Sequence, residues 1–196
     1  MITPTYKQLR DLCRKKGYRW FDNPFDLNFI GIRNSSTKSN DFDDTIAIAY
    51  VDSDYRPRVF VAPFTCDPGT DYLLTPMNPK GAAIIPEGQY LGLWMLGKHK
   101  GYTALTQRKP ILVKRDNDKD TAIGGVLSSV LEIAGLDFHR ALEFDIVATV
   151  GKFSAGCQVV QVPEDFNYII SLVKLQVKFV KSAIVSYTLI KEFDLM

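Results

Sequence analysis

A histidine and a cysteine in the second half of the chain have the residue types of a thiol nucleophile and its base. His139 is followed, after a gap of fourteen residues, by the sequence Ser154-Ala155-Gly156-Cys157. A thiol becomes a good nucleophile when a nearby imidazole takes its proton. The small residues before the cysteine would let a carbonyl group reach the sulfur, with Ser154 and Gly156 supporting a turn whose backbone N–H groups bind an oxyanion. We therefore interpret Cys157 and His139 as a candidate catalytic pair.

Each of these chemically interesting residues also has a simpler explanation. Cys157 could be a buried thiol in a tight turn, because a short string of small residues does not decide the matter alone. His99 lies in the polar turn 97–101, where a histidine is usually solvated, although it could line the site. Cys13 falls on the apolar face of a predicted helix and Cys66 stands beside a turn, which favours structural roles for both. Only Cys157 has a histidine at a suitable distance upstream.

The length and composition predict a single domain over residues 1–196. Hydrophobic residues make up 46% and charged residues 23% of the chain, with a formal net charge of +2. Such a small charge does not indicate nucleic-acid binding, and no apolar run is long enough to cross a bilayer, so we expect neither nucleic acid nor membrane insertion. Three cysteines do not suggest a disulfide framework, and no signal peptide is visible. We expect synthesis in a reducing cytoplasm, with another means of export for any role outside it.

Metal binding is not expected from the sequence. The chain has neither a CxxC nor an HExxH pattern, which are typical of zinc sites. Asp41, Asp43 and Asp44 form a short acidic cluster but lack the ligand spacing of a calcium loop.

Apolar periodicity predicts a strand-rich α+β domain with helices near both ends. The first helix is expected to begin near residues 3–4 and end at Gly17, and the last to run from Pro163 into 178–180. Proline suits a first helical turn, and the acidic residues that follow it favour the positive end of the helix dipole. Strand-like runs occupy residues 29–32, 45–51, 58–64, 82–85, 90–96, 111–114 and 183–190, and a further apolar run at 144–149 precedes the cysteine segment.

The order of these residues resembles the catalytic domain of the L,D-transpeptidases (the YkuD-type family). That family has a histidine, a gap of about this length and a Ser/Thr-His-Gly-Cys block, which is similar to the segment from Ser154 to Cys157. Residues 85–90, Ile-Pro-Glu-Gly-Gln-Tyr, resemble the family's Thr-Pro-x-Gly-x-Phe/Tyr segment, with Gly88 and Tyr90 at its glycine and aromatic positions. A bacteriophage-encoded branch of the family is similar over residues 67–69, Gln107, 114–116, 138–141 and 152–159.

The chain departs from the family pattern at two positions. Ala155 replaces the histidine of the Ser-His-Gly-Cys block, and Val159 stands where the family has Arg or Asn. Because valine cannot bind a carboxylate, another polar group would have to contact the substrate. Gln158 and Arg140 are candidates by position, together with Gly88 and Tyr90 from the upstream segment. An equally good alternative is that Gln158 only ties the cysteine turn to a neighbouring strand and that Arg140 is solvated.

The resemblance implies a mostly-β L,D-transpeptidase-like domain whose cysteine faces a long groove. Cys157 would attack an amide bond of a peptidoglycan stem peptide and form an acyl-enzyme, with His139 as base and then acid and with no metal or cofactor. Transfer of the acyl group to an amine gives a crosslink, whereas transfer to water gives hydrolysis. A phage protein of this kind would be carried in the virion or released at lysis.

Other functional classes remain open. The main alternative is a catalytically inactive phage virion structural protein or cell-wall-binding module that reuses the fold and contacts other virion proteins. A sortase-like transpeptidase also places histidine before cysteine, but the chain has no Thr-Leu-x-Thr-Cys block. Papain-like peptidases have the opposite order of cysteine and histidine.

Overall fold

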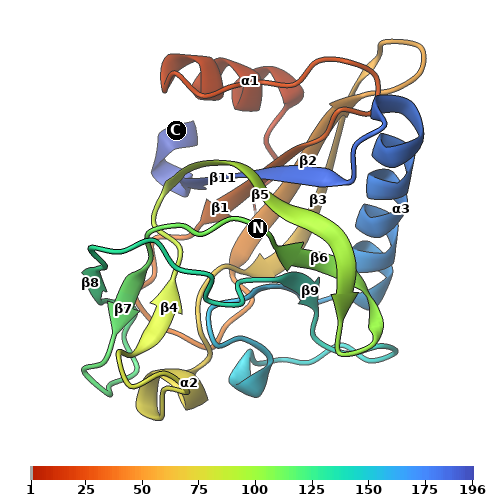
Figure 1. Cartoon of the computed structure of the whole chain (residues 1–196). Helices are drawn as coiled ribbons and strands as arrows, with labels where there is room; N and C mark the ends of the chain where they lie inside the picture. Colours follow the sequence, from red (N-terminus) through yellow and green to blue (C-terminus); the bar gives the residue numbers. More distant parts are fainter. Residues whose placement is uncertain (1) are drawn as a thin grey trace.

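The structure, a computed structural model, describes residues 2–196. A closed barrel forms its centre, with α1 across one end, α3 along one side and a small separate sheet on the opposite side (Figure 1). The elements in chain order are α1 (Tyr6–Lys15), β1 (Asn28–Arg33), β2 (Asp44–Val51), β3 (Pro57–Thr65), α2 (Thr70–Leu74), β4 (Ala82–Ile84), β5 (Gly88–His99), β6 (Tyr102–Gln107), β7 (Lys114–Asp116), β8 (Val126–Leu127), β9 (Phe138–Arg140), the 3₁₀ helix η1 (Gly151–Phe153), β10 (Gln158–Val160), α3 (Pro163–Val180), β11 (Ile184–Lys191) and the 3₁₀ helix η2 (Glu192–Leu195).

Eight strands close the barrel in the order β1-β11-β5-β6-β9-β10-β3-β2. Most neighbours are antiparallel, but β11 pairs with β1 in parallel, with Phe29 opposite Tyr187. The short strands β9 and β10 are also parallel, with His139 opposite Val159. Strands β4, β7 and β8 form a second sheet outside the barrel.

Local sequence explains where both long helices begin and end. Thr5 caps α1 through a capping box with Gln8, which satisfies N–H groups that the first turn leaves free. Pro163 occupies the first turn of α3, where it loses no helical hydrogen bond, and Lys181 ends the helix in the left-handed conformation. The apolar face of α3 packs into the same core cluster as the barrel interior.

Aromatic side chains fill the middle of the barrel. Phe29, Trp94, Phe138 and Tyr187 are almost fully buried and contact one another at ring-centroid distances between 4.6 and 6.2 Å. Gly31 is required beside them, since an added Cβ would lie 2.0 Å from the Tyr187 hydroxyl.

The mixed, strand-rich architecture with helices near both ends is confirmed, and several boundaries differ from expectation. Residues 144–149 form no strand, because Phe144 and Ile146 are exposed and have no neighbouring sheet face to cover them. Residues 111–113 lie outside β7, with Ile111 forming only an isolated bridge to Glu132. The sequence also did not predict β6, β9 and β10 as strands, because β9 and β10 are too short to show a period.

Candidate active site

His139 and Cys157 lie on one face of two adjacent strands. Residue Val159 of β10 pairs with His139 of β9, and side chains two positions apart on a strand point to the same side. Cys157, two residues before Val159, therefore lies on the side of His139. Phe138 and Gln158 point to the opposite side, into the barrel, where both are fully buried. The fourteen-residue gap thus forms a loop that returns the chain beside His139.

Ser154 and Gly156 shape the turn before the cysteine. The Ser154 hydroxyl accepts a hydrogen bond from the Gly156 N–H at 3.1 Å and donates to the Cys157 carbonyl at 2.8 Å. Gly156 has φ +124°, and an added Cβ would lie 2.1 Å from the Ala83 carbonyl oxygen. Only glycine fits this close approach to β4. Among the described residues, no acceptor engages the Cys157 N–H, which leaves it available to an oxyanion.

The hydrogen bonding of His139 assigns its tautomer. Its Nδ1 lies 2.8 Å from the Arg140 carbonyl oxygen, which can only accept, so Nδ1 carries the proton and Nε2 is left as a base. The side chain is only 4% exposed. The pKa of His139 is lowered to about 4, mainly by burial, with His99 and Lys100 acting in the same direction and the hydrogen bond to Arg140 and the charge of Asp137 opposing them. His139 is therefore a neutral imidazole at neutral pH.

The Cys157 thiol is partly exposed, and it donates a hydrogen bond to the Gly135 carbonyl oxygen at 3.2 Å. The described residues show no direct hydrogen bond between this sulfur and His139. Burial raises the pKa of Cys157 to about 12, although the backbone N–H of Asp137 favours the thiolate. Burial thus favours a neutral thiol and a neutral imidazole in the resting site.

A second histidine belongs to this cluster. The His99 ring stacks on the His139 ring with centroids 4.2 Å apart and planes 8° from parallel. Its Nδ1 lies 2.9 Å from Oδ2 of Asp137, and Oδ1 of Asp137 accepts from the Gln107 N–H at 2.9 Å. Sequence reasoning left His99 undecided and did not consider Asp137. The only available signal was the position of Asp137 two residues before His139.

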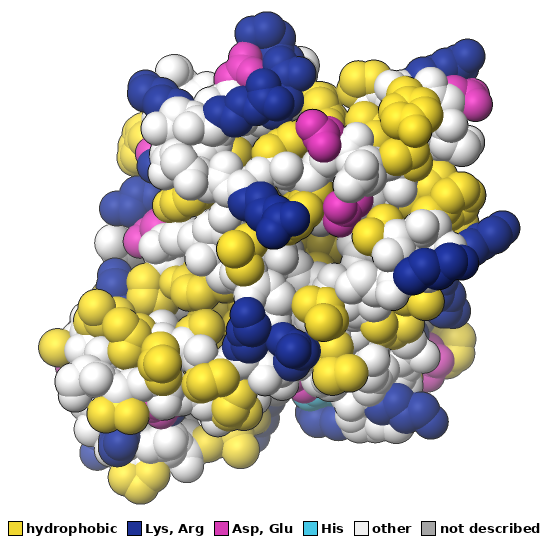
Figure 2. All heavy atoms as spheres, turned by 45° about the horizontal axis from the view of Figure 1, so that its top comes forward, with side chains coloured by type: hydrophobic (Ala, Val, Ile, Leu, Met, Phe, Trp, Pro, Cys, Tyr) yellow, Lys and Arg dark blue, Asp and Glu magenta, His cyan; other side chains and the backbone are white. Residues whose placement is uncertain are grey.

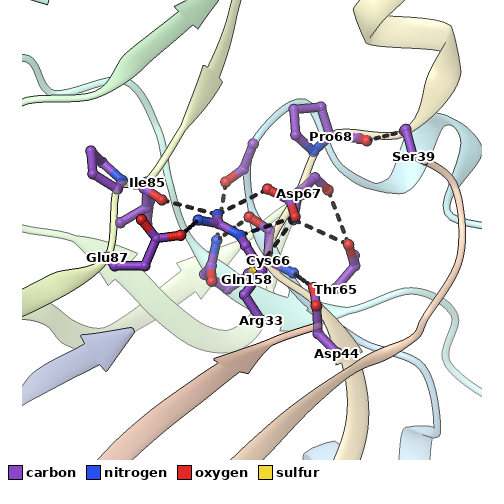
Figure 3. A network of polar contacts seen from close by, with 12 residues as sticks. Arg33, Ser39, Asp44, Thr65, Cys66, Asp67, Pro68, Ile85, Glu87 and Gln158 are labelled. Carbon is purple, nitrogen blue, oxygen red and sulfur yellow. Dashed lines mark hydrogen bonds and ion pairs between the residues drawn. The ribbon is translucent and has the colours of Figure 1, made fainter. Parts of the chain in front are cut away.

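Gln158 lies beneath the cysteine turn and does not face a substrate (Figure 3). Its amide donates to the carbonyl oxygens of Cys66 and Gly156 at 3.1 and 3.3 Å, and its Oε1 accepts from the Tyr187 hydroxyl at 2.6 Å. With these contacts in a fully buried environment, Gln158 ties the turn to the barrel interior. The proposal that it binds substrate is corrected accordingly.

A buried ionic network surrounds Gln158 (Figure 3). Arg33 forms ion pairs with Asp67 at 2.9 Å and Glu87 at 2.7 Å and donates to the Ile85 carbonyl oxygen. Burial opposes the charged form, but Cys66, Asp67 and Glu87 hold the pKa of Arg33 above its ordinary value.

The oxygen and sulfur atoms of Asp44, Cys66 and Asp67 are close enough together to ligate a metal ion. However, the Arg33 guanidinium already lies 3.2 Å from both the Cys66 sulfur and Asp67. A positive charge is therefore supplied by the protein itself, and a second cation would be repelled.

The other residues that the sequence predicted to bind substrate make contacts within the protein instead. Arg140 pairs with Glu143 at 2.9 Å and lies over the Tyr102 ring at 4.4 Å. The Tyr90 hydroxyl donates to the Pro86 carbonyl oxygen at 2.6 Å, and Gly88 begins β5 opposite Leu189. The preceding strand, through Ala83, is the part of this region that closely approaches Gly156 of the cysteine turn, whereas these contacts of Gly88 and Tyr90 lie within the barrel wall.

A cavity of about 310 Å³ opens beside the cysteine turn. Ala155 lines it together with the ion pair of Arg115 and Glu132 and with residues from α2 to β4, namely Tyr72, Met77, Asn78, Gly81, Ala82 and Ala83. This is a polar space next to the cysteine turn, on the side of Ala155.

Comparison with known proteins identifies no relative: no family model, no curated protein and no solved structure matches the chain. Among the described residues, no helix has the length and apolarity needed to span a membrane.

Proposed function

We propose that the chain is a cysteine-dependent enzyme that cleaves or transfers an amide bond of peptidoglycan stem peptides through an acyl-enzyme, with an L,D-transpeptidase-like fold. The observation that carries the proposal is the shared face of Cys157 and His139, with Nδ1 of His139 bound to a carbonyl so that Nε2 is the free base. The closed barrel is compatible with the mostly-β domain that the family resemblance implies.

The neutral resting pair implies a concerted first step. The thiol turns away from the Gly135 carbonyl, and its proton passes to Nε2 of His139 as the Cys157 sulfur bonds to the substrate carbonyl carbon. The Cys157 N–H holds the oxyanion. His139 then gives its proton to the leaving nitrogen as the C–N bond breaks. Water or an amine replaces the sulfur in the second half-reaction, losing its proton to His139, which returns a proton to the sulfur.

The test is mass spectrometry of purified stem peptides after incubation with the protein. We expect the wild type to release a shortened peptide or form a crosslinked one, and Cys157→Ala and His139→Gln to form neither. Cys13→Ala is the matched control, because Cys13 is a buried thiol in a separate cluster beneath α1. Product formation by Cys157→Ala at the wild-type rate would reject the proposed mechanism.

A second candidate function, a non-catalytic virion or wall-binding module, is favoured by one observation. Large apolar side chains on and after β8 are more than half exposed, and hydrophobic side chains gather on the side of the molecule where the small sheet lies (Figure 2). These residues are Val126, Leu127, Val130, Leu131 and Ile133. Surfaces of this kind commonly mark contacts with other molecules.

Pelleting with purified cell-wall sacculi separates the two candidates. A binding module would lose binding in Leu127→Glu and keep it in Cys157→Ala, without product from any stem peptide. Delivery in the virion or at lysis fits either candidate.

A further inference from the structure

His99 and Asp137 are held more firmly than a solvated loop pair would be. Both side chains are only 17% exposed. The Asp137 carboxylate has a partner on each oxygen, the ring of His99 and the Gln107 N–H. The side chain of Gln107 in turn accepts from the N–H groups of Ala134 and Leu136, which flank the carbonyl that binds the thiol. One hydrogen-bonded chain therefore runs from His99 to the loop beside Cys157.

The stacking of His99 on His139 places a second ring where charge develops during the reaction. When His139 takes the thiol proton it becomes an imidazolium cation in a buried position. A nearby carboxylate attracts such a cation. His99 covers the ring, and Asp137 supplies the negative charge behind it.

We propose that His99, held by Asp137, is a positioning residue of the candidate active site: its ring fixes the ring plane of His139, while the carboxylate of Asp137 stabilises the protonated form of His139. This inference rests on the proposed function for its effect on turnover. Its geometry concerns the resting protein and can be tested without a substrate.

Other ionisable groups also lie around His139, and a pH experiment must distinguish their effects from those of His99 and Asp137. Lys100 follows His99 at the end of β5, Tyr102 on β6 lies edge-on to His99 with ring centroids 5.9 Å apart, and Cys157 precedes β10. Asp137 raises the pKa of both His139 and Cys157, whereas Lys100 lowers both. Loss of the Asp137 charge should therefore make the thiol easier to ionise and the imidazole harder to protonate.

These opposite effects on Cys157 and His139 are what the proposal predicts and what an experiment can measure. In Asp137→Asn, the amide oxygen can still accept from Gln107 while the negative charge is lost. We expect iodoacetamide to modify Cys157 about threefold to tenfold faster at pH 8 than in the wild type, because more thiolate is present. Turnover of stem peptides should fall about tenfold to a hundredfold, because the His139 cation is less stable. A general loosening of the site would also speed alkylation, because it exposes the thiol, but it would raise the titration midpoint of His139, which the proposal expects to fall.

Nuclear magnetic resonance can follow the titration of His139 directly, because the chain has only two histidines. In His99→Phe a ring still covers His139, and the remaining imidazole is assigned without ambiguity. We expect the titration midpoint of His139 to move to lower pH in Asp137→Asn and to higher pH in His99→Phe, because Asp137 raises and His99 lowers the pKa of His139. His99→Asn keeps an N–H for Asp137 but loses the stack, and should reduce turnover more than His99→Phe, which keeps a ring over His139.

Lys98→Ala is the matched control, because Lys98 is an exposed cation on the same strand. In this variant the titration midpoint of His139, the rate of Cys157 alkylation and the turnover of stem peptides should equal those of the wild type. Unchanged His139 midpoints in both His99→Phe and Asp137→Asn, or shifts in the same direction, would overturn the inference. If the midpoints shift as expected but the wild type turns over no stem peptide, the proposed function fails and the electrostatic coupling stands.

Discussion

Two polar clusters lie on opposite faces of β9 and β10, and they differ in how completely their hydrogen bonds are satisfied. The inner cluster of Arg33, Asp67 and Gln158 is saturated by protein partners, with ion pairs and amide contacts between 2.6 and 3.3 Å. The outer cluster leaves Nε2 of His139 and the Cys157 N–H without a partner among the described residues. Saturated buried groups hold a fold together, whereas unsatisfied groups beside a thiol can bind and react.

The largest effect on stability is expected from removal of the inner cation. Arg33→Met leaves the carboxylates of Asp67 and Glu87 without their partner in a mostly buried position. We expect the free energy of unfolding to fall by about 3–5 kcal/mol, as for other broken buried ion pairs, measured by urea denaturation.

Arg58→Met is the control for this change, because the Arg58–Asp52 pair is exposed on the arginine side and should contribute much less to stability than the buried pairs of Arg33. Equal losses in the two variants would remove the distinction between a saturated inner cluster and the protein surface.

An intermediate effect is expected at the contact between Gln158 and Tyr187. Gln158→Leu leaves the buried Tyr187 hydroxyl without its acceptor and should lower the free energy of unfolding by about 1–3 kcal/mol. The double variant with Tyr187→Phe should cost less than the sum of the two single changes, because the Tyr187 hydroxyl is then no longer left unsatisfied. Strict additivity would show that the hydrogen bond does not stabilise the inner cluster.

The sequence predicted the long elements and singled out the two candidate site residues, Cys157 and His139, but not how these parts are assembled. α1, α3 and the strand pair β2–β3 follow from apolar period, capping residues and turn chemistry over short distances. The parallel pairing of β11 with β1 joins segments separated by most of the chain, and no local pattern encodes it.

The same limit applies to the candidate site. Cys157 and His139 could be selected by residue type and order, whereas the role of Gln158 depends on which face of a three-residue strand it occupies. Likewise His99 reaches His139 only because the end of β5 and its neighbour β6 lie beside β9. Burial also favours a neutral thiol at Cys157, and this desolvation cannot be read from neighbours in sequence.

The smallest effect is expected at Arg140, which lies between the two clusters. Its guanidinium pairs with the exposed side chain of Glu143 and lies over Tyr102, so Arg140→Ala should lower the free energy of unfolding by less than about 1 kcal/mol. Its backbone carbonyl, which holds Nδ1 of His139, is kept in the variant, so turnover of stem peptides should stay within about twofold of the wild type. A loss of about tenfold to a hundredfold that Arg140→Lys does not restore would show instead that the guanidinium leaves Glu143 to bind a substrate carboxylate as a planar fork. Arg140 would then belong to the outer cluster, and its guanidinium would make the carboxylate contact that Val159 cannot make.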